Sequence, residues 1–285
     1  MSQPRSERRL RGFSLSSGWQ SKGTNTGATK RARDIWQESC QTTKELSVQA
    51  FEQTSVPPLN SESVQHSEVS KTPREKSKRG GARNRADRGS YALSGTDVAK
   101  SIAATHFATA IGLPFTRMIT IHWESAGVQL FNMPRATGRF IDLLTKALAR
   151  HGSRTSWVWV HENGHLKGAH CHILAHIPAT LVSVVNALQR GWLRAITGKP
   201  YKRGVIHSKP IGGRLGLERS NAELHAKNLT AALCYLLKGA TPEVCAQHGL
   251  SCMEAGGYVL GKRCGISQNV STKARTAFAS GLPSK

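Results

Sequence analysis

The sequence lacks long apolar runs and disulfide-type cysteine motifs. No stretch reaches the roughly 18 apolar residues of a membrane-spanning helix, and the opening MSQPRSERRLRGFSL contains no apolar signal core. We therefore expect no membrane partner. The six cysteines form no CxxC pair, and without a signal peptide they predict reduced thiols inside the cell rather than a secreted disulfide framework.

Acidic residues are also scarce. The chain has 40 Lys and Arg against 17 Asp and Glu, a net charge of +23. Such an excess favours a polyanionic partner, and with no support for a membrane that partner is expected to be nucleic acid. The chain contains no GxxxxGK[ST] phosphate loop, so a built-in ATP-driven motor is not indicated.

The composition divides the chain in two. Residues 1–90 are rich in Ser, Thr, Gln and charged residues, carry a net +8, and cannot bury enough apolar surface to offset their ordering entropy, so we expect a disordered basic extension. Residues 91–285 have a globular pattern and a net charge of +15, and they include a basic C-terminal segment.

Hydrophobic periodicity in the second part predicts an α+β domain, with an antiparallel sheet flanked by helices. The adjacent strands of a hairpin, with helices interspersed, favour this class over a doubly wound parallel sheet. Helices are expected over 92–112, 135–152, 179–198 and 221–240, the last capped by Gly239, and strands over 115–123, 156–162, 169–177 and part of 202–213.

The stretch GAHCHILAHIP, residues 168–178, places histidines at alternating positions of a predicted strand. His170 and His172 would share a face because side-chain direction alternates along a strand. A predicted hairpin returns Glu162 to the neighbourhood of His170. Two imidazoles and a carboxylate form a divalent-metal set. Taken alone, the pattern is equally compatible with a half-exposed polar strand edge, and the side on which Glu162 points depends on a register that the sequence leaves open.

Three other histidines are not expected to be metal ligands. We expect His161, His165 and His176 to form hydrogen bonds or to face phosphate. His122, in the first predicted strand, fits either the same sheet face or the core.

Only four tyrosines are present, and Tyr235 is the one on a strongly predicted helix. Lys238 lies three residues further on, so the phenol and the ammonium share a helix face. A nearby ammonium stabilises a phenolate and the charge that develops on a phosphate, as a tyrosine nucleophile requires. The alternative for this segment alone is an amphipathic helix with a tyrosine at its boundary.

Together these motifs resemble a known family. HCH, residues 170–172, resembles the His-hydrophobe-His motif of the HUH endonucleases, and YLLK, residues 235–238, is similar to the YxxK motif of rolling-circle replication initiators. The resemblance covers about residues 113–240 and is strongest to the replication proteins of plasmids and filamentous phages. Cys171 departs mildly from the usual bulkier middle residue, which concerns packing behind the sheet more than the chemistry.

The resemblance implies a single-tyrosine DNA nickase and strand transferase with the palm fold of that family. Tyr235 would attack single-stranded DNA or an origin hairpin, leaving a 5′-phosphotyrosine link and a free 3′-hydroxyl. His170, His172 and Glu162 would hold Mg²⁺ or Mn²⁺, and Lys238 would position the phosphate. A bacterial cytoplasmic setting, with a host helicase and polymerase as partners, is implied too. Relaxases and transposases use the same chemistry and stay open, as does a non-catalytic nucleic-acid-binding protein.

Clustered basic residues predict the surface that neutralises DNA phosphates. Those in the loop-rich region before the last predicted helix and in the C-terminal segment are Lys199, Lys202, Arg203, Lys209, Arg214, Lys262 and Arg263, followed by Lys273 and Arg275. Tyr201 or an exposed Trp192 is expected to stack on an unpaired base, whereas Trp157 and Trp159 are expected in the core.

Overall fold

The computed structural model describes residues 88–165, 167–251 and 254–280. The predicted disordered extension, residues 1–90, lies almost entirely outside the described residues. The part that is described contains the whole segment on which the candidate site depends.

A five-stranded antiparallel sheet forms the centre of this region, in the order β5-β2-β4-β3-β7. Its strands are β2 (Arg117–His122), β3 (Trp157–Gly164), β4 (Gly168–Ala175), β5 (Ile206–Pro210) and β7 (Cys264–Ile266). A separate two-stranded ribbon pairs β1 (Gly89–Ser90) with β6 (Val259–Leu260). Strand β4 therefore lies in the middle of the main sheet, between β2 and β3.

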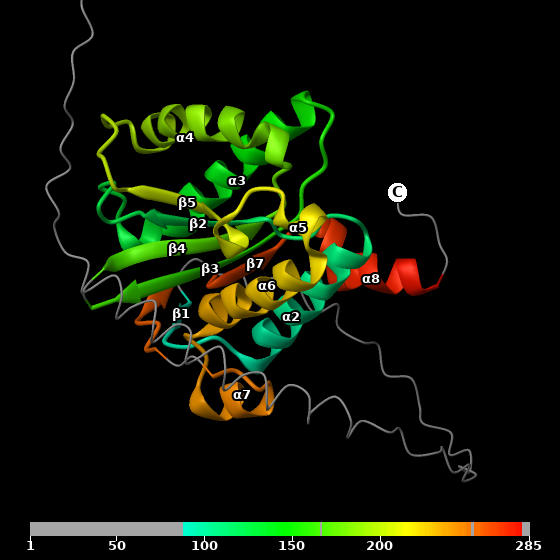
Figure 1. Cartoon of the computed structure of the whole chain (residues 1–285). Coiled ribbons are helices and arrows are strands. Elements are labelled where there is room, and N and C mark those ends of the chain that lie inside the picture. The colour runs from blue at the N-terminus through cyan, green and yellow to red at the C-terminus, as the bar shows by residue number, and fades with distance from the viewer. Residues whose placement is uncertain (1–87, 166, 252–253, 281–285) are drawn as a thin grey trace, which may run out of the picture. The chain divides into compact units, whose positions relative to one another are not determined.

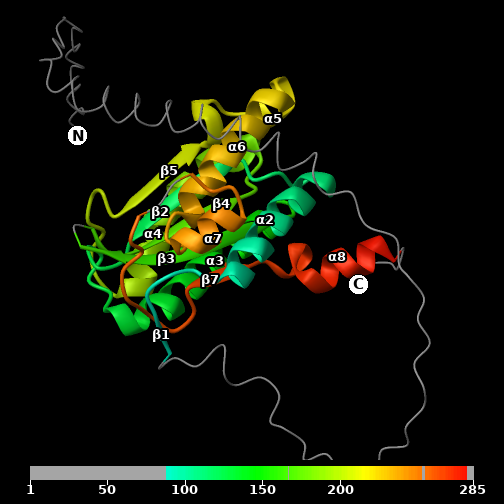
Figure 2. The ribbon, with the colours of Figure 1, turned by 90° about the horizontal axis from the view of Figure 1, so that it is seen from below.

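Helices cover both faces of the main sheet (Figure 1). One face carries α3 (Met133–Arg150) and α4 (Val182–Thr197), and the other carries α2 (Gly95–Ala110) and α6 (Ala222–Leu237). Figure 2 shows α2, α6 and α7 in front of the sheet when it is viewed from below. The shorter helices are α5 (Leu217–Ser220), α7 (Pro242–Gln247) and α8 (Thr272–Ala279), with 3₁₀ turns at Leu130–Asn132, Ala179–Leu181, Ile211–Gly213 and Gln268–Val270.

Alternate side chains of β4 pack against the helices on opposite faces of the sheet. Cys171 and Ile173 pack into the core beneath α3 and α4, while Leu174 joins the core beneath α2 and α6. His170 and His172 point to the same side as Leu174, because successive side chains of a strand alternate between its faces. The two histidines therefore lie on the face that α6 covers. Cys171 is fully buried behind the sheet.

The α+β class and the antiparallel sheet flanked by helices are confirmed. The expected succession of elements also appears, from α2 through α6, with the short α5 as an addition. The expected glycine cap of α6 is wrong: the helix ends at Leu237, and Gly239 does not have the positive φ of such a cap.

Strand β7 is the main element that the sequence did not predict. It has only three residues and pairs with β3 about a hundred positions earlier in the chain. Gly265, in the middle of β7, makes the pairing possible, because a Cβ there would lie 2.3 Å from Cε2 of Trp159. The absence of a side chain lets the strand lie against the indole.

We expect Gly265→Ala to destabilise the protein by about 2 kcal/mol, since overpacking a close contact forces neighbouring atoms to shift. Urea denaturation followed by circular dichroism measures this change in the free energy of unfolding. Gly191→Ala in α4 is the matched control, because a Cβ there meets no atom within 4 Å. That substitution should stabilise the helix by about 0.5–1 kcal/mol. Equal effects of the two substitutions would contradict the assigned role of Gly265.

Candidate metal centre

The register of the β3–β4 hairpin places Glu162 directly opposite His170. Residues opposite each other in an antiparallel pair project to the same face, so the carboxylate joins His170 and His172 on one side of the sheet. The orientation of Glu162, which the sequence left open, is thereby determined.

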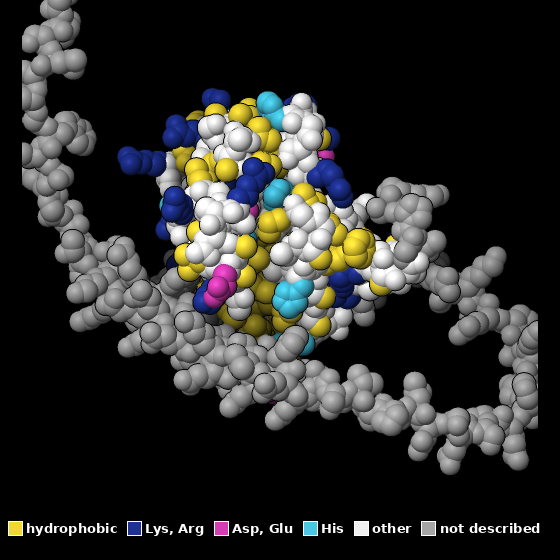
Figure 3. Space-filling view, turned by 45° about the vertical axis from the view of Figure 1, so that its right-hand side comes forward, with side chains coloured by type: hydrophobic (Ala, Val, Ile, Leu, Met, Phe, Trp, Pro, Cys, Tyr) yellow, Lys and Arg dark blue, Asp and Glu magenta, His cyan; other side chains and the backbone are white. Residues whose placement is uncertain are grey.

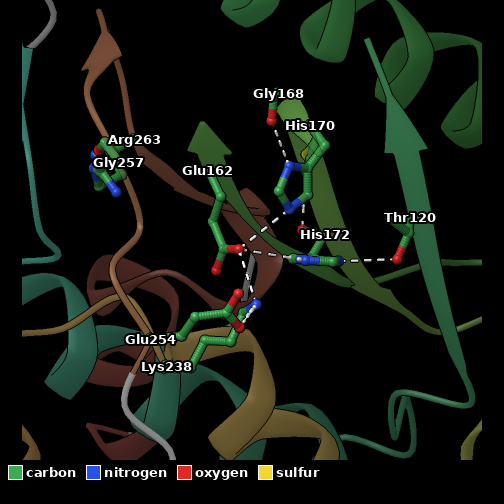
Figure 4. Close-up of polar contacts among 10 residues, drawn as sticks. Thr120, Glu162, Gly168, His170, His172, Lys238, Glu254, Gly257 and Arg263 are labelled. Carbon is green, nitrogen blue, oxygen red and sulfur yellow. Dashed lines mark hydrogen bonds and ion pairs between the residues drawn. The ribbon is translucent and has the colours of Figure 1, made fainter. Parts of the chain in front are cut away.

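The three side chains form a compact buried cluster (Figure 4). Oε2 of Glu162 lies 3.2 Å from Nε2 of His170 and 3.6 Å from Nε2 of His172. Each of the three residues is at most 3% exposed. One candidate ligand atom from each residue falls within 4.8 Å of the others. This is the geometry in which three side chains could hold one metal ion.

Neighbouring oxygens orient the two imidazoles. Nδ1 of His170 lies 2.8 Å from the carbonyl oxygen of Gly168 and donates its proton there. Nδ1 of His172 lies 2.9 Å from Oγ1 of Thr120. In both rings Nε2 is therefore the atom turned toward Glu162. Such partners commonly fix the tautomer and ring position of metal-binding histidines.

Unpartnered polar atoms indicate that the cluster fits a cation. Oε1 of Glu162 and Nε2 of His172 are buried and have no hydrogen-bond partner among the described residues, whereas buried polar atoms are normally satisfied. Nε2 of His170 faces a carboxylate oxygen, a contact that requires a proton or a metal ion between the two atoms. A carboxylate and two imidazoles are a ligand set of first-row divalent metals.

Electrostatics keeps the groups in ligand-competent forms. Burial raises the pKa of Glu162, but the neighbouring imidazoles of His170 and His172 and the charge of Lys238 outweigh it, so the pKa lies well below its ordinary value. Burial lowers the pKa of His172. Glu162 is consequently ionised and His172 is neutral near pH 7, as metal coordination requires.

Helix α6 brings Tyr235 and Lys238 to the same cluster. The ring of Tyr235 lies edge-on to that of His172, with 5.1 Å between centroids. Nζ of Lys238 lies 3.2 Å from Oε2 of Glu162 and 4.5 Å from the centroid of the Tyr235 ring. Burial lowers the pKa of Lys238, but Glu162 and Glu254 raise it more, leaving it above its ordinary value and the side chain charged. All five residues predicted for the site are in one place.

Glu254 is a contributor that the sequence did not single out. Its carboxylate accepts a hydrogen bond from the Lys238 ammonium, and its backbone N–H donates to the Lys238 carbonyl at 3.0 Å. The Glu254 side chain is 58% exposed while that of Lys238 is buried. Its only sequence signal is that it is one of eight acidic residues in 91–285. Glu254 is thus a solvent-exposed residue in contact with the buried centre.

Three further histidines for which the sequence made predictions lie outside the metal-ligand cluster. His122 lies opposite His170 across β2 and β4, half-exposed on the site face, which resolves its ambiguous prediction. Nδ1 of His161 donates to the Lys262 carbonyl and Nε2 accepts from Thr137, each at 2.8 Å, on the opposite face of the sheet. His176 bonds to the Pro114 carbonyl at 2.7 Å. His161 and His176 are hydrogen-bonding residues, as expected.

Two residues predicted at the nucleic-acid surface are buried, and the prediction that Trp192 stacks on a base is wrong. Arg263 is 5% exposed, and its guanidinium donates to the Ser90 side chain and to the carbonyls of Ser90 and Gly257. Its side chain is thus anchored to neighbouring segments and does not belong to the open surface. Trp192 is 8% exposed and packs edge-on against Phe140 at 5.6 Å, so it is a core residue unable to stack on a base. Trp159 is buried, as expected.

The other basic residues predicted for that surface are exposed, except for the half-buried Arg275. They are Lys199, Lys202, Arg203, Lys209, Arg214, Lys262 and Lys273. The β2–β5 register places Lys209 opposite Met118 and His207 opposite Thr120, so both lie on the same sheet face as the cluster. On the face in Figure 3, Lys and Arg side chains are spread widely and Asp and Glu are few. The face of the molecule seen in Figure 3 is therefore predominantly basic.

Comparison with protein-family models, curated proteins and solved structures finds no match to this chain. Among the described residues, no helix combines the length and the apolar character needed to cross a membrane. What the chain does must therefore be argued from the site itself.

We expect Mn²⁺ to raise the thermal unfolding midpoint of the full chain, because an ion that binds only the folded state stabilises it by mass action. At a hundredfold excess over the dissociation constant the gain is about 2.7 kcal/mol. Differential scanning fluorimetry with and without Mn²⁺, and with EDTA, measures the shift. His172→Ala should remove it. His207→Ala, which deletes an exposed imidazole on the same face, should keep it. An identical shift in both variants would place the ion elsewhere.

Proposed function

We propose that this protein is a divalent-metal-dependent nickase and strand transferase for single-stranded DNA that uses Tyr235 as its nucleophile and initiates rolling-circle replication of a plasmid or phage. One observation carries the proposal: a helix from a distant part of the chain places a tyrosine and a lysine against a buried carboxylate and two histidines. The Tyr235 ring lies against His172 and the Lys238 ammonium against Glu162. The HUH and YxxK resemblance supports the same assignment.

The chemistry is a transesterification at phosphorus. The phenol oxygen of Tyr235 loses its proton to solvent and forms a bond to the phosphorus atom. The bond to the 3′ oxygen breaks, and that oxygen leaves with the electron pair and takes up a proton. The products are a 5′-phosphotyrosine and a 3′-hydroxyl that can prime synthesis. The reverse attack by a 3′-hydroxyl rejoins the strand and restores the phenol.

Each side chain has a distinct task in this scheme. Lys238, 4.5 Å from the Tyr235 ring centroid, stabilises the phenolate and the negative charge on the phosphate. Glu162, His170 and His172 would hold Mg²⁺ or Mn²⁺, which when bound supplies Lewis-acid polarisation of a phosphoryl oxygen. Thr120 and the Gly168 carbonyl keep the imidazoles oriented.

The exposed basic residues suit a single-stranded substrate. Lys209 and His207 extend the site face of the sheet toward its edge at β5, and Lys199 and Lys202 belong to the connection that precedes this strand. Cations along such a path neutralise backbone phosphates and make affinity dependent on salt. Because residues 88–280 show no phosphate loop, strand separation would come from a host helicase, and a host polymerase would extend the 3′-hydroxyl, in the bacterial cytoplasm.

Covalent trapping tests the proposal. The full chain is incubated with 5′- and 3′-labelled pools of single-stranded oligonucleotides and Mn²⁺, and denaturing gels are used to detect protein–DNA adducts. We expect an adduct on the fragment downstream of the cut, which Tyr235→Phe abolishes. Tyr201→Phe, a matched loss of a phenol oxygen away from the cluster, should retain it. Lys238→Met should reduce the rate of adduct formation by about 10²–10³.

Other outcomes would replace the proposal with a different function. Cleavage that survives Tyr235→Phe but requires His170 would indicate hydrolysis by a metal-activated water. Tight, salt-sensitive binding without cleavage of any strand in the pool would indicate a non-catalytic binding protein.

Glu254 yields a separate prediction about affinity. Its carboxylate occupies one side of the Lys238 ammonium, where it repels and competes with a phosphate group. We expect Glu254→Gln to tighten oligonucleotide binding by about threefold at low salt, measured by fluorescence anisotropy in EDTA. Glu243→Gln, which removes an exposed carboxylate on α7, is the charge-matched control and should change affinity less. Equal changes would show that only net charge matters.

A further inference from the structure

We propose that a second, basic cavity binds the phosphate backbone of a single-stranded nucleic acid, at a site separate from the metal centre. The cavity has a volume of about 670 Å³ and is lined by the β1 strand, the start of α2, the β7 strand with the loop before it, and the start of α8. None of its lining residues belongs to the Glu162, His170 and His172 cluster. The inference rests on the proposed nucleic-acid substrate but not on tyrosine chemistry.

The charge of the lining is strongly unbalanced. Among the described residues that line it, the cations are Arg88, Lys100, Lys262, Arg263 and Lys273, and the one acid is Asp97. Asp97 lies in the first turn of α2, where its carboxylate accepts a hydrogen bond from the Ser94 hydroxyl at 2.7 Å. Within the described part of the chain, none of the five cations forms an ion pair. Five cations against one carboxylate around one hollow favour an anionic occupant.

Arg263 is the buried member of this set. Its Nε and Nη2 donate to neutral groups, the Ser90 hydroxyl and backbone carbonyls, and Nη1 has no partner. Desolvation lowers the pKa of Arg263 to about 10, so the guanidinium stays charged near pH 7. A buried guanidinium that forms no ion pair with a described residue is costly, and a ligand of opposite charge would lower that cost.

Helix α8 adds a second source of positive potential. Its first turn carries Lys273 and no acidic residue, although cations are disfavoured near a helix N-terminus. The side-chain hydroxyl of the N-cap Ser271 accepts a hydrogen bond from the backbone N–H of Ala274, and its carbonyl accepts one from the backbone N–H of Arg275. A phosphate beside Thr272 and Lys273 would offset both the lysine and the helix dipole.

Two exposed aromatic rings favour a nucleic acid over free phosphate. No residue that lines the cavity is aromatic, so the cavity itself is suited to phosphate rather than to a base. Tyr91, however, directly follows Ser90, the residue of the β1–β6 ribbon in the lining, and its ring lies against that of Tyr258 with 5.0 Å between the centroids. Tyr91 is 74% exposed and stands between the lining residues Ser90 and Ala92. A basic hollow beside exposed aromatic rings is the usual composition of a single-strand site.

The test separates the electrostatic from the stacking contribution. A fluorescein-labelled oligothymidylate is titrated with the full chain in EDTA at several KCl concentrations, and anisotropy gives the dissociation constant and its salt dependence. We expect the double variant Lys100→Gln/Lys273→Gln to weaken binding about tenfold at low salt. It should reduce the slope of log K against log [KCl] by about 1.4, since each phosphate contact on a single strand contributes about 0.7.

Two further variants complete the design. Tyr91→Ala should weaken binding by about fivefold or more with an unchanged slope, because stacking is not electrostatic. Arg135→Gln/Arg150→Gln removes the same charge from exposed positions on α3, on the other face of the sheet, and should leave the slope nearly unchanged. If this control lowers the slope as much as the cavity variant, the proposal is overturned, because the binding is then diffuse.

The remaining outcomes distinguish the sources of phosphate and the two proposals. Inorganic phosphate could stabilise the wild type against heat but not the double variant, while neither variant changes oligonucleotide binding. That combination would overturn the nucleic-acid assignment in favour of free phosphate. If an adduct forms but the double variant leaves the slope of log K against log [KCl] unchanged, the proposal for the cavity alone is overturned. The expected change of slope without any adduct would support the cavity and contradict the tyrosine nucleophile.

Discussion

The pairing of Glu162 with His170 across the β3–β4 hairpin is the constraint on which the site depends. A slip of one residue would turn the carboxylate toward α3 and leave the histidines without it, because the faces of a strand alternate with every residue. Both faces of this hairpin are buried, with Trp159 and Ile173 on one side and Val160 and Leu174 on the other. The hydrophobic cores that stabilise the sheet therefore also hold the metal-ligand register.

Charge balance explains why Lys238 belongs to this arrangement. A lone ionised carboxylate under a helix would be costly, and the ammonium, itself 3% exposed, neutralises Glu162 within the same buried space. With a divalent ion bound, the cluster would carry an excess of positive charge. Glu254 supplies one compensating charge from the solvent side, and a phosphodiester would supply another. The site is thus suited electrostatically to an anionic substrate.

The parts of the site that local patterns encode could be predicted from the sequence, and the rest could not. The alternation of His170 and His172 and the spacing of Tyr235 and Lys238 are local, and the short hairpin limits where Glu162 can lie. Glu254 and Arg263 lie outside any periodic element, and their roles depend on contacts with distant residues. For the same reason β7 could not be predicted. Its three residues have no hydrophobic pattern of their own, and they form a strand because they pair with β3.

The segment from Glu254 to Arg263 links the two sites that we propose. At one end Glu254 binds Lys238, and at the other Arg263 lines the basic cavity. Between them the Gly256 carbonyl accepts from the backbone N–H of Asn163 at 2.8 Å. Gly257 has a φ of 66°, and a Cβ there would lie 1.7 Å from the Asn163 carbonyl oxygen, so only glycine fits. Because this one short segment is held against the end of β3, beside Glu162, the packing of Gly256 and Gly257 on Asn163 positions a residue of each site.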